Sequence, residues 1–290
     1  MEFRERLNTG GFLKLVEVLP PKGVGAEQFE KRLVPVKGKV DAVYIPSLQG
    51  GIMRVESWAA AKYLQDRGYE TIFEVCCAHK NRVALQAEVL GGAFLGLRNV
   101  MVVAGDDPKL GDHPEAKAVF DVDVMGLLEG IKGLKKGYDM AGSDLEGAPD
   151  LCVGAKVDAS AQGPLLELEL RDMERKIRLG VEFFITTTVY DLEQLQRFME
   201  RAKEFKVPVI AGLMILKSAG MARYINKHVE GVLIPEGVIE RLLKAPDKVE
   251  ESARIAAEMI QGMREICQGV NLIPIGWEEK VPLVLEEAGL

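Results

Sequence analysis

The chain has 290 residues with a formal net charge of −7, and 48% of them are hydrophobic while 28% are charged. This composition is typical of a folded domain and argues against disorder. No apolar run approaches the ~18 residues of a membrane span, the start (residues 1–11) lacks the apolar stretch of a signal peptide, and no basic stripe suggests nucleic-acid binding. We therefore expect a cytoplasmic protein with no membrane span and no nucleic-acid partner.

Short apolar runs alternate with longer amphipathic stretches along the chain. The runs are rich in Val, Ile, Leu and Phe, which is typical of strands buried on both faces of a sheet. We predict eight such strands, at residues 12–19, 40–46, 71–77, 99–104, 150–157, 182–188, 207–214 and 270–276.

The stretches between these strands carry apolar residues three and four positions apart, as amphipathic helices do. They are residues 55–66, 81–95, 121–135, 165–179, 192–205, 221–227, 236–244, 247–267 and 278–288. Gly68, Gly96 and Gly180 follow helical stretches, where a left-handed cap is favoured. Asp191 is a good N-cap for the helix that follows it.

Strands that alternate with helices predict a parallel sheet. Eight such units in a chain of this length favour a closed (β/α)₈ TIM barrel of the α/β class, with residues 1–290 as a single domain. An open doubly wound sheet is the alternative, and the lack of a G-x-G-x-x-G motif after the first strand weakens it. The loop at residues 105–120 is long for such a connection, which is typical of a functional loop.

The four cysteines, at positions 76, 77, 152 and 267, contain no C-x-x-C pair. His79, His113 and His228 are scattered along the chain. We therefore predict reduced, buried thiols and no metal site.

In a barrel of this kind the chemistry lies at the carboxyl ends of the strands. Glu17 lies within the apolar run of the first strand, where burial favours a neutral carboxyl group and hence a general acid. An ion-paired structural role is the alternative. Asp106 follows the fourth strand after Gly105, which would let backbone and ligand approach closely, and its carboxylate could accept paired N–H donors from a heterocycle. A turn or N-cap role is equally compatible with its position.

Other polar residues at strand ends allow two interpretations. Residues 186–188 are threonines, which favour strands for structural reasons alone. Lys156 ends the fifth strand and could hold a phosphate or a backbone carbonyl. Arg175 and Lys176 lie within a helix, where a solvated face is the ordinary explanation.

Several motifs together resemble the methylenetetrahydrofolate reductase family over nearly the whole chain. Its E-x-x-P-P motif resembles Val16 to Pro21, and its stretch ending in G-D-x-P resembles Asn99 to Pro108. Its R-K-x-x-x-G-x-x-x-x-I-T-Q segment resembles Arg175 to Thr187, followed by Asp191. The stretch Pro208 to Met214 resembles a further family segment. Residues 81–86 and 275–278 resemble a short bacterial branch that lacks a regulatory domain.

The resemblance implies a flavoenzyme of one-carbon metabolism and methionine biosynthesis that reduces 5,10-methylenetetrahydrofolate to 5-methyltetrahydrofolate. The cofactor implied is FAD, with FMN as the alternative, and NADH or NADPH is the implied electron donor. Glu17 would protonate folate N10 as the general acid, and Asp106 would hold the pterin edge near the flavin. Thr187, Met221 and Tyr224 match positions that contact folate. The positions that match flavin contacts are Glu74, Ala104, Gly105, Asp106, Lys156, Ser160, Gly163, Glu169, Asp172, Arg175 and Lys176.

The sequence departs from the family at several of these positions. Thr187 stands where Gln is common, Ala104 where Arg is common, and Glu74 where His is common, while Lys156 and Ser160 replace Tyr and His. These departures motivate the alternative of a folate- or flavin-binding subunit in an electron-transfer complex without nicotinamide activity of its own. An unrelated barrel enzyme is a third option. We expect a homo-oligomer.

Overall fold

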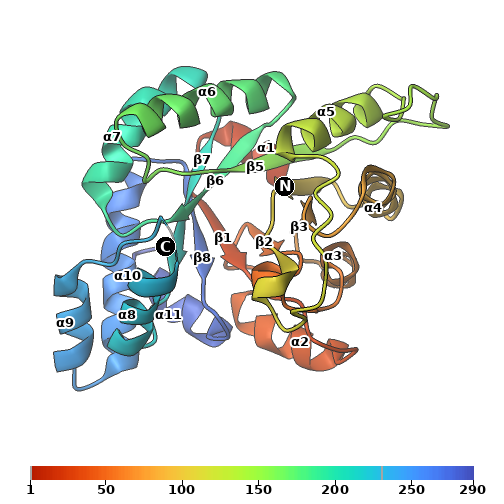
Figure 1. Ribbon diagram of the computed structural model, residues 1–290. Helices are drawn as coiled ribbons and strands as arrows, with labels where there is room; N and C mark the ends of the chain where they lie inside the picture. Colours follow the sequence, from red (N-terminus) through yellow and green to blue (C-terminus); the bar gives the residue numbers. More distant parts are fainter. Residues whose placement is uncertain (1, 230) are drawn as a thin grey trace.

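The computed structural model describes residues 2–229 and 231–290, and within them eight parallel strands close into a barrel in sequence order (Figure 1). The strands are β1 (Leu13–Glu17), β2 (Ala42–Ile45), β3 (Thr71–Cys76), β4 (Asn99–Val103), β5 (Cys152–Val157), β6 (Phe183–Thr188), β7 (Val209–Met214) and β8 (Gly269–Ile273). β1 pairs with both β2 and β8, which closes the sheet. The predicted (β/α)₈ barrel is therefore confirmed.

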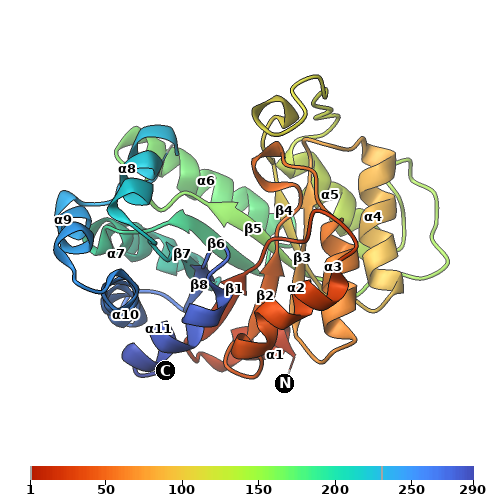
Figure 2. The same ribbon diagram turned by 90° about the horizontal axis from the view of Figure 1, so that it is seen from below.

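Helices surround the barrel and connect its strands (Figures 1 and 2). They are α1 (Phe3–Thr9), α2 (Ala26–Leu33), α3 (Ser57–Gln65), α4 (Arg82–Phe94), α5 (Val124–Lys135), α6 (Pro164–Arg178), α7 (Leu192–Ala202), α8 (Ala219–His228), α9 (Glu236–Lys244), α10 (Lys248–Arg264) and α11 (Val281–Glu287). Short 3₁₀ turns η2 (Gln49–Gly51) and η3 (Pro108–Leu110) lie in the loops after β2 and β4. No helix in the described ranges is long and apolar enough to cross a membrane.

The local signals from the sequence are confirmed. Gly68, Gly96 and Gly180 all have positive φ, at 81°, 87° and 101°. The carboxylate of Asp191 accepts a hydrogen bond from the backbone N–H of Gln194 and so caps α7. All four cysteines are free and buried.

Two helices, α1 and α2, were not predicted from the sequence. Each is short and carries only two buried residues four positions apart, Phe3 and Leu7 in α1 and Phe29 and Leu33 in α2. One such pair is too little to reveal a periodicity, so tertiary contact decides these helices. The Phe3 ring packs edge-on against Phe183 with centroids 5.1 Å apart.

The barrel interior is filled near its amino-terminal end. Leu15, Tyr44, Ile72, Met101 and Ile185 form a buried cluster there with Phe3 of α1. Gly154 belongs to the same layer, because a Cβ at this position would lie 2.3 Å from the Phe183 ring. A larger cluster fills the layer between strands and helices.

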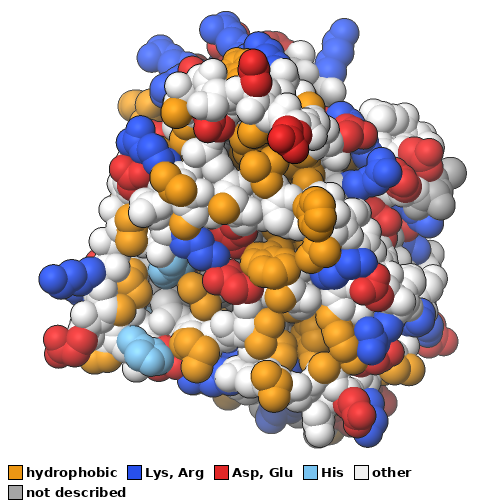
Figure 3. All heavy atoms as spheres, turned by 90° about the vertical axis from the view of Figure 1, so that its right-hand side faces the viewer, with side chains coloured by type: hydrophobic (Ala, Val, Ile, Leu, Met, Phe, Trp, Pro, Cys, Tyr) orange, Lys and Arg blue, Asp and Glu red, His pale blue; other side chains and the backbone are white. Residues whose placement is uncertain are grey.

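Strand periodicity then determines which residues reach the open end. Side chains two positions apart point to the same face of a strand. On three strands the residue two positions after a core residue is polar, so polar groups replace apolar ones toward the carboxyl ends. The pairs are Leu15 and Glu17, Ile72 and Glu74, and Ile185 and Thr187. Figure 2 shows the loop after β4 at one end of the barrel and α1 at the other. One side of the molecule carries acidic and basic side chains interspersed with apolar ones (Figure 3).

Candidate functional site

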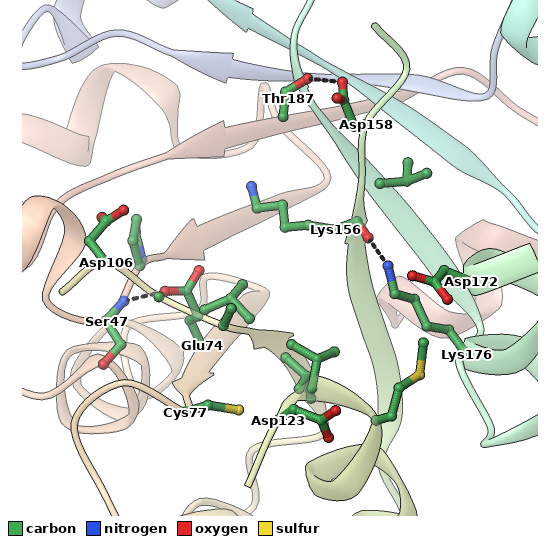
Figure 4. Close-up of a pocket in the computed structure, with 18 of the residues that line it drawn as sticks. Ser47, Glu74, Cys77, Asp106, Asp123, Lys156, Asp158, Asp172, Lys176 and Thr187 are labelled. Atoms are coloured by element: carbon green, nitrogen blue, oxygen red, sulfur yellow. Dashed lines mark hydrogen bonds between the residues drawn. The ribbon is translucent and has the colours of Figure 1, made fainter. Parts of the chain in front are cut away.

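A cavity of about 630 Å³ opens at the carboxyl ends of the strands. Val102, Val103, Phe120, Val124 and Met125 supply apolar lining, which suits a flat heterocycle. Figure 4 shows polar side chains from several strands around the same space. The position agrees with the general rule for enzymes built on this fold.

Glu74 and Tyr44 form the buried polar floor of this cavity. The Tyr44 hydroxyl donates to Oε2 of Glu74, and the backbone N–H of Ser47 donates to Oε1 at 2.9 Å. Burial raises the pKa of Glu74 to about 7, although Lys156 and these hydrogen bonds act in the opposite direction. The pKa of Tyr44 is raised by burial and by Glu74. Glu74 therefore holds a proton to a higher pH than an exposed glutamate does.

Lys156 projects from β5 into the cavity toward Asp106 and Glu74 (Figure 4). Its ammonium group lies 4.9 Å from the centroid of the Tyr44 ring. Its backbone carbonyl accepts a hydrogen bond from Nζ of Lys176 at 3.0 Å. The side chain and the main chain of Lys156 thus serve different partners.

One turn contacts both carboxylates proposed for catalysis. In η2, the side-chain amide of Gln49 donates to Oε1 of Glu17 at 3.0 Å, and the backbone N–H of Gly50 donates to Oδ2 of Asp106 at 2.8 Å. Glu17 is only 4% exposed and also accepts from the amide of Asn271 at 3.3 Å. Glu17 and Asp106 therefore converge on the same end of the barrel.

The opposite wall is formed by β5, β6 and α6. The Thr187 hydroxyl donates to Oδ1 of Asp158 at 3.3 Å, and Oε1 of Glu169 accepts from the backbone N–H of Asp158 at 3.2 Å. Lys176 lies 3.8 Å from Glu169. Carboxylates outnumber lysines along the cavity lining: Glu74, Asp106, Asp123, Asp158, Glu169 and Asp172 against Lys156 and Lys176.

Most of the predicted cofactor positions line this cavity. These are Glu74, Ala104, Gly105, Asp106, Lys156, Glu169, Asp172 and Lys176, together with Thr187 from the predicted substrate set. The fold itself requires glycine at position 105, because its φ is +83° and a Cβ there would lie 1.9 Å from Sγ of Cys76. Packing against Cys76 therefore requires a glycine here, and the close approach of a ligand to Gly105, which lines the cavity, stays a prediction.

The other predicted residues lie outside the lining of this cavity, and Glu17 is one of them, linked to the lining through Gln49. Ser160 lines a smaller neighbouring pocket with Thr187, and Gly163 is the N-cap of α6. Arg175 is largely exposed but contacts Asp172 at 3.3 Å. In α8, the sulfur of Met221 accepts from the backbone N–H of Lys217, and the ring of Tyr224 stacks on His228 with centroids 4.2 Å apart.

Sequence reasoning missed several residues of the site. Tyr44 and Asn271 lie inside apolar runs and resemble core residues, while Gln49 and Ser47 lie in a loop without a recognisable motif. Asp158 is two positions beyond Lys156 at the end of β5, so the rule that located Lys156 could have found it. Cys77 lines the cavity, but burial raises its thiol pKa to about 11, which keeps it protonated.

Comparison with known proteins identifies the family. The sequence profile described as Methylenetetrahydrofolate reductase matches residues 2–289, which is nearly the whole chain.

The chain belongs to the methylenetetrahydrofolate reductase family.

Curated relatives in this family are distant. Methylenetetrahydrofolate reductase 2 of Schizosaccharomyces pombe is 21% identical over 304 aligned residues, which cover 99% of this chain and 47% of that protein. Methylenetetrahydrofolate reductase 1 of the same organism is 21% identical over 237 residues, covering 76% and 37%. The chain thus spans about half the length of the curated relatives it matches, or less.

Solved structures agree on the fold. An uncharacterised protein from Clostridium thermocellum, described as binding two copies of 5-methyl-5,6,7,8-tetrahydrofolic acid, superposes with a TM-score of 0.69 at 16% identity, covering 100% of this chain and 99% of that one. An oxaloacetate acetylhydrolase structure gives a TM-score of 0.56 at 10% identity, covering 100% and 87%. At these identities the likeness shows a shared barrel.

Four of the five positions at which the sequence was expected to depart from the methylenetetrahydrofolate reductase family line the cavity: Glu74, Ala104, Lys156 and Thr187. Glu74 and Lys156 are neighbours on its floor, and Ala104 lines the space beside them. Glu74, Ala104 and Lys156 thus lie within one cavity, so their side chains together determine its charge.

Proposed function

We propose that the chain reduces 5,10-methylenetetrahydrofolate to 5-methyltetrahydrofolate with a flavin bound in the cavity. The observation that carries this proposal is the η2 turn, which holds Glu17 through Gln49 and Asp106 through Gly50. A buried proton donor and an exposed carboxylate beside one cavity suit a substrate that must be both oriented and protonated. The folate-binding neighbour from Clostridium thermocellum supports the substrate class.

Asp106 is the group proposed to orient the pterin ring. Its Oδ2 already accepts from Gly50, which fixes the carboxylate, and the side chain is exposed at the cavity mouth. The 2-amino and ring N–H groups of a reduced pterin are paired donors, which a carboxylate accepts well. Asp106 would therefore hold the pterin edge and leave the one-carbon unit facing the cavity.

Glu17 is the proposed general acid, delivering a proton to folate N10 so that the five-membered ring opens. The Asn271 amide can form a hydrogen bond with the Glu17 carboxyl group in either protonation state of that group. The Asn271 amide nitrogen donates to Oε2 of Glu17 at 3.3 Å, and its buried Oδ1 lacks a partner among the described residues. A rotation of the amide by 180° would let that oxygen accept from the protonated carboxyl group.

The residues of the cavity fit a flavin. Apolar side chains offer surfaces for the ring, and Asp158 and Glu169 offer acceptors for ribityl or ribose hydroxyls. The candidates for phosphate are Lys176, which also contacts Glu169 and the carbonyl of Lys156, and Arg175, which lies beside Asp172 at the outer edge. When bound, the flavin supplies the hydride that reduces the one-carbon unit. FAD is proposed, with FMN as the alternative, and NADH or NADPH as the electron donor.

Replacement of Glu17 by Gln tests the proposal. The variant should bind flavin, and its flavin should be reduced by the donor at the normal rate. Formation of 5-methyltetrahydrofolate should fall by about 10²–10⁴-fold, because one proton-transfer group is lost. Stopped-flow absorbance separates the two half-reactions. The exposed Glu146 supplies the control variant, Glu146→Gln. Normal folate turnover by Glu17→Gln contradicts the proposal.

A second candidate function is a folate- and flavin-binding subunit that receives electrons from a partner protein. The replacements at Glu74, Ala104 and Thr187 favour it, because they alter the surroundings of the cofactor. Assays of the isolated chain with reduced nicotinamide and with a reduced viologen dye distinguish the two. Activity with the dye alone supports the subunit. Sedimentation of the same sample tests the expected homo-oligomer.

A further inference from the structure

The proposed function assigns no role to the ammonium group of Lys156. Within residues 2–229 and 231–290, no carboxylate oxygen lies within ion-pairing distance of its ammonium group, although the cavity is rich in carboxylates. The other cavity lysine, Lys176, is held by Glu169 and by the carbonyl of Lys156. Lysine side chains are cations at neutral pH. Lys156 thus presents hydrogen-bond donors to whatever occupies the cavity.

The floor around Lys156 is fixed by other contacts. Tyr44 is 1% exposed, and its ring lies beneath the ammonium group at 4.9 Å. Both oxygens of Glu74 already accept hydrogen bonds, from Tyr44 and from Ser47. Glu74 is therefore near enough to act on Lys156 electrostatically, while each of its oxygens already accepts one hydrogen bond. The ammonium group of Lys156 remains as a charged donor on this floor.

The position of Lys156 argues against a phosphate-binding role. It points from β5 toward Glu74 and Asp106 (Figure 4), which is the end of the cavity where a pterin edge is proposed to bind. The phosphate candidates, Lys176 and Arg175, lie on α6 at the other side. A flavin that reacts with a pterin held by Asp106 must place its ring at that end. Lys156 then faces the ring rather than the phosphate tail.

We propose that Lys156 contacts the flavin ring and stabilises the negative charge that the ring gains on reduction, with Glu74 as the group that opposes it. This inference rests on the proposed function. A hydride brings two electrons and one proton to a neutral oxidised ring and leaves one negative charge on it. No proton is transferred from Lys156 in this step, and its Coulombic attraction favours the reduced ring.

The test is the midpoint potential of bound flavin in matched variants. Lys156→Met removes the charge with little change in volume, and we expect the preference for reduced over oxidised flavin to fall at least tenfold, which is 29.6 mV for a two-electron couple. Lys156→Arg, which keeps the positive charge, should keep most of the preference for reduced flavin. Glu74→Gln should shift the potential in the opposite direction at pH 8, where Glu74 is ionised. Lys244→Met, which changes an exposed lysine of α9, is the control.

The outcomes separate this inference from the proposed function. If Lys156→Met binds flavin with an unchanged potential, the inference is overturned and the flavin proposal stands. If the unchanged chain takes up no flavin, both are overturned. Circular dichroism checks the fold of each variant, and Lys156→Gln is the second neutral variant if Met at this position misfolds.

Discussion

Three carboxylates at one end of the barrel have three different environments. Glu17 is held by two amides, Glu74 by a phenol and a backbone N–H, and Asp106 by one backbone N–H at the cavity mouth. Environment rather than residue type separates such groups into acids, orienting groups and electrostatic partners. The proposed mechanism assigns one of these roles to each.

The acidic wall of the cavity should limit flavin affinity. Asp172 lies on α6 beside Arg175, at 3.3 Å, and would face the phosphates. Asp172→Asn removes a negative charge, leaves Arg175 free and keeps a hydrogen-bonding side chain. We expect about fivefold tighter FAD binding, equivalent to about 1 kcal/mol for a partly exposed charge. Fluorescence titration measures it.

Lumiflavin, which has the ring but no phosphate, is the matched ligand control. Its affinity should be the same for Asp172→Asn and the unchanged chain. A weaker affinity for FAD in the variant would show that the Asp172 carboxylate itself binds the cofactor.

Sequence patterns predicted only some residues of the site, for a physical reason. Glu17 lies within an apolar run and Lys156 near the end of one, so each is a charged residue in a predicted strand and is visible in the sequence. Tyr44 and Asn271 are compatible with a core, and their polar atoms acquire a role only through partners on other strands. Glu17 and Asn271 are 254 positions apart in sequence. No local pattern contains that contact.

At the level of elements, three loops are joined above the strands. Asp112, in the loop after β4, pairs with Lys22 in the loop after β1 and accepts from the backbone N–H of Met53 in the loop after β2. Lys22 and this N–H hold the pKa of Asp112 well below its usual range. The same loops carry Gln49 and Asp106, so their packing determines how the two proposed catalytic carboxylates are presented.

Gly111 is the point of closest approach between two of these loops. A Cβ at Gly111 would lie 1.9 Å from the carbonyl oxygen of Gly51. Gly111→Ala should therefore push η2 away and displace Gln49 and Gly50 from Glu17 and Asp106. We expect folate turnover to fall by up to about 10²-fold, as for misplacements near 1 Å, while the melting temperature changes little. Steady-state kinetics and calorimetry measure the two effects.

Gly237→Ala in α9 is the control, because nothing lies within 4 Å of its added Cβ. A Gly111→Ala variant with normal kinetics would show that the loops adjust freely and do not position the carboxylates.

At the scale of the whole molecule, the barrel separates stability from chemistry. One end of the barrel is filled by the interior layer around Leu15, Ile72 and Phe183 together with the buried side chains of α1. The cavity occupies the other end. The count of apolar runs predicted the closed sheet, since strands buried on both faces read as continuous apolar segments. The short helices α1 and α2 could not be predicted, because contacts with the finished barrel stabilise them.

A buried acid outside the cavity makes the stability of the whole protein depend on pH. Glu88 of α4 is 7% exposed, and burial raises its pKa from 4.5 to about 7 despite the nearby ammonium group of Lys80, which also pairs with Glu56. Because the folded state holds this proton more tightly, the contribution of Glu88 to stability is complete below pH 4.5 and is lost as pH rises through about 7. Glu74 acts in the same direction.

Glu88→Gln removes one of these titrations. The free energy of unfolding of the unchanged protein should fall between pH 5 and pH 8, and in the variant that fall should shrink by about 3 kcal/mol, the equivalent of a shift of this size. Urea unfolding at the two pH values measures the difference. Glu146→Gln, on an exposed residue, should leave the fall unchanged. A Glu88→Gln protein with the full pH dependence would mean that Lys80 keeps Glu88 ionised in the folded state, and that the buried pair behaves as a salt bridge at every pH in this range.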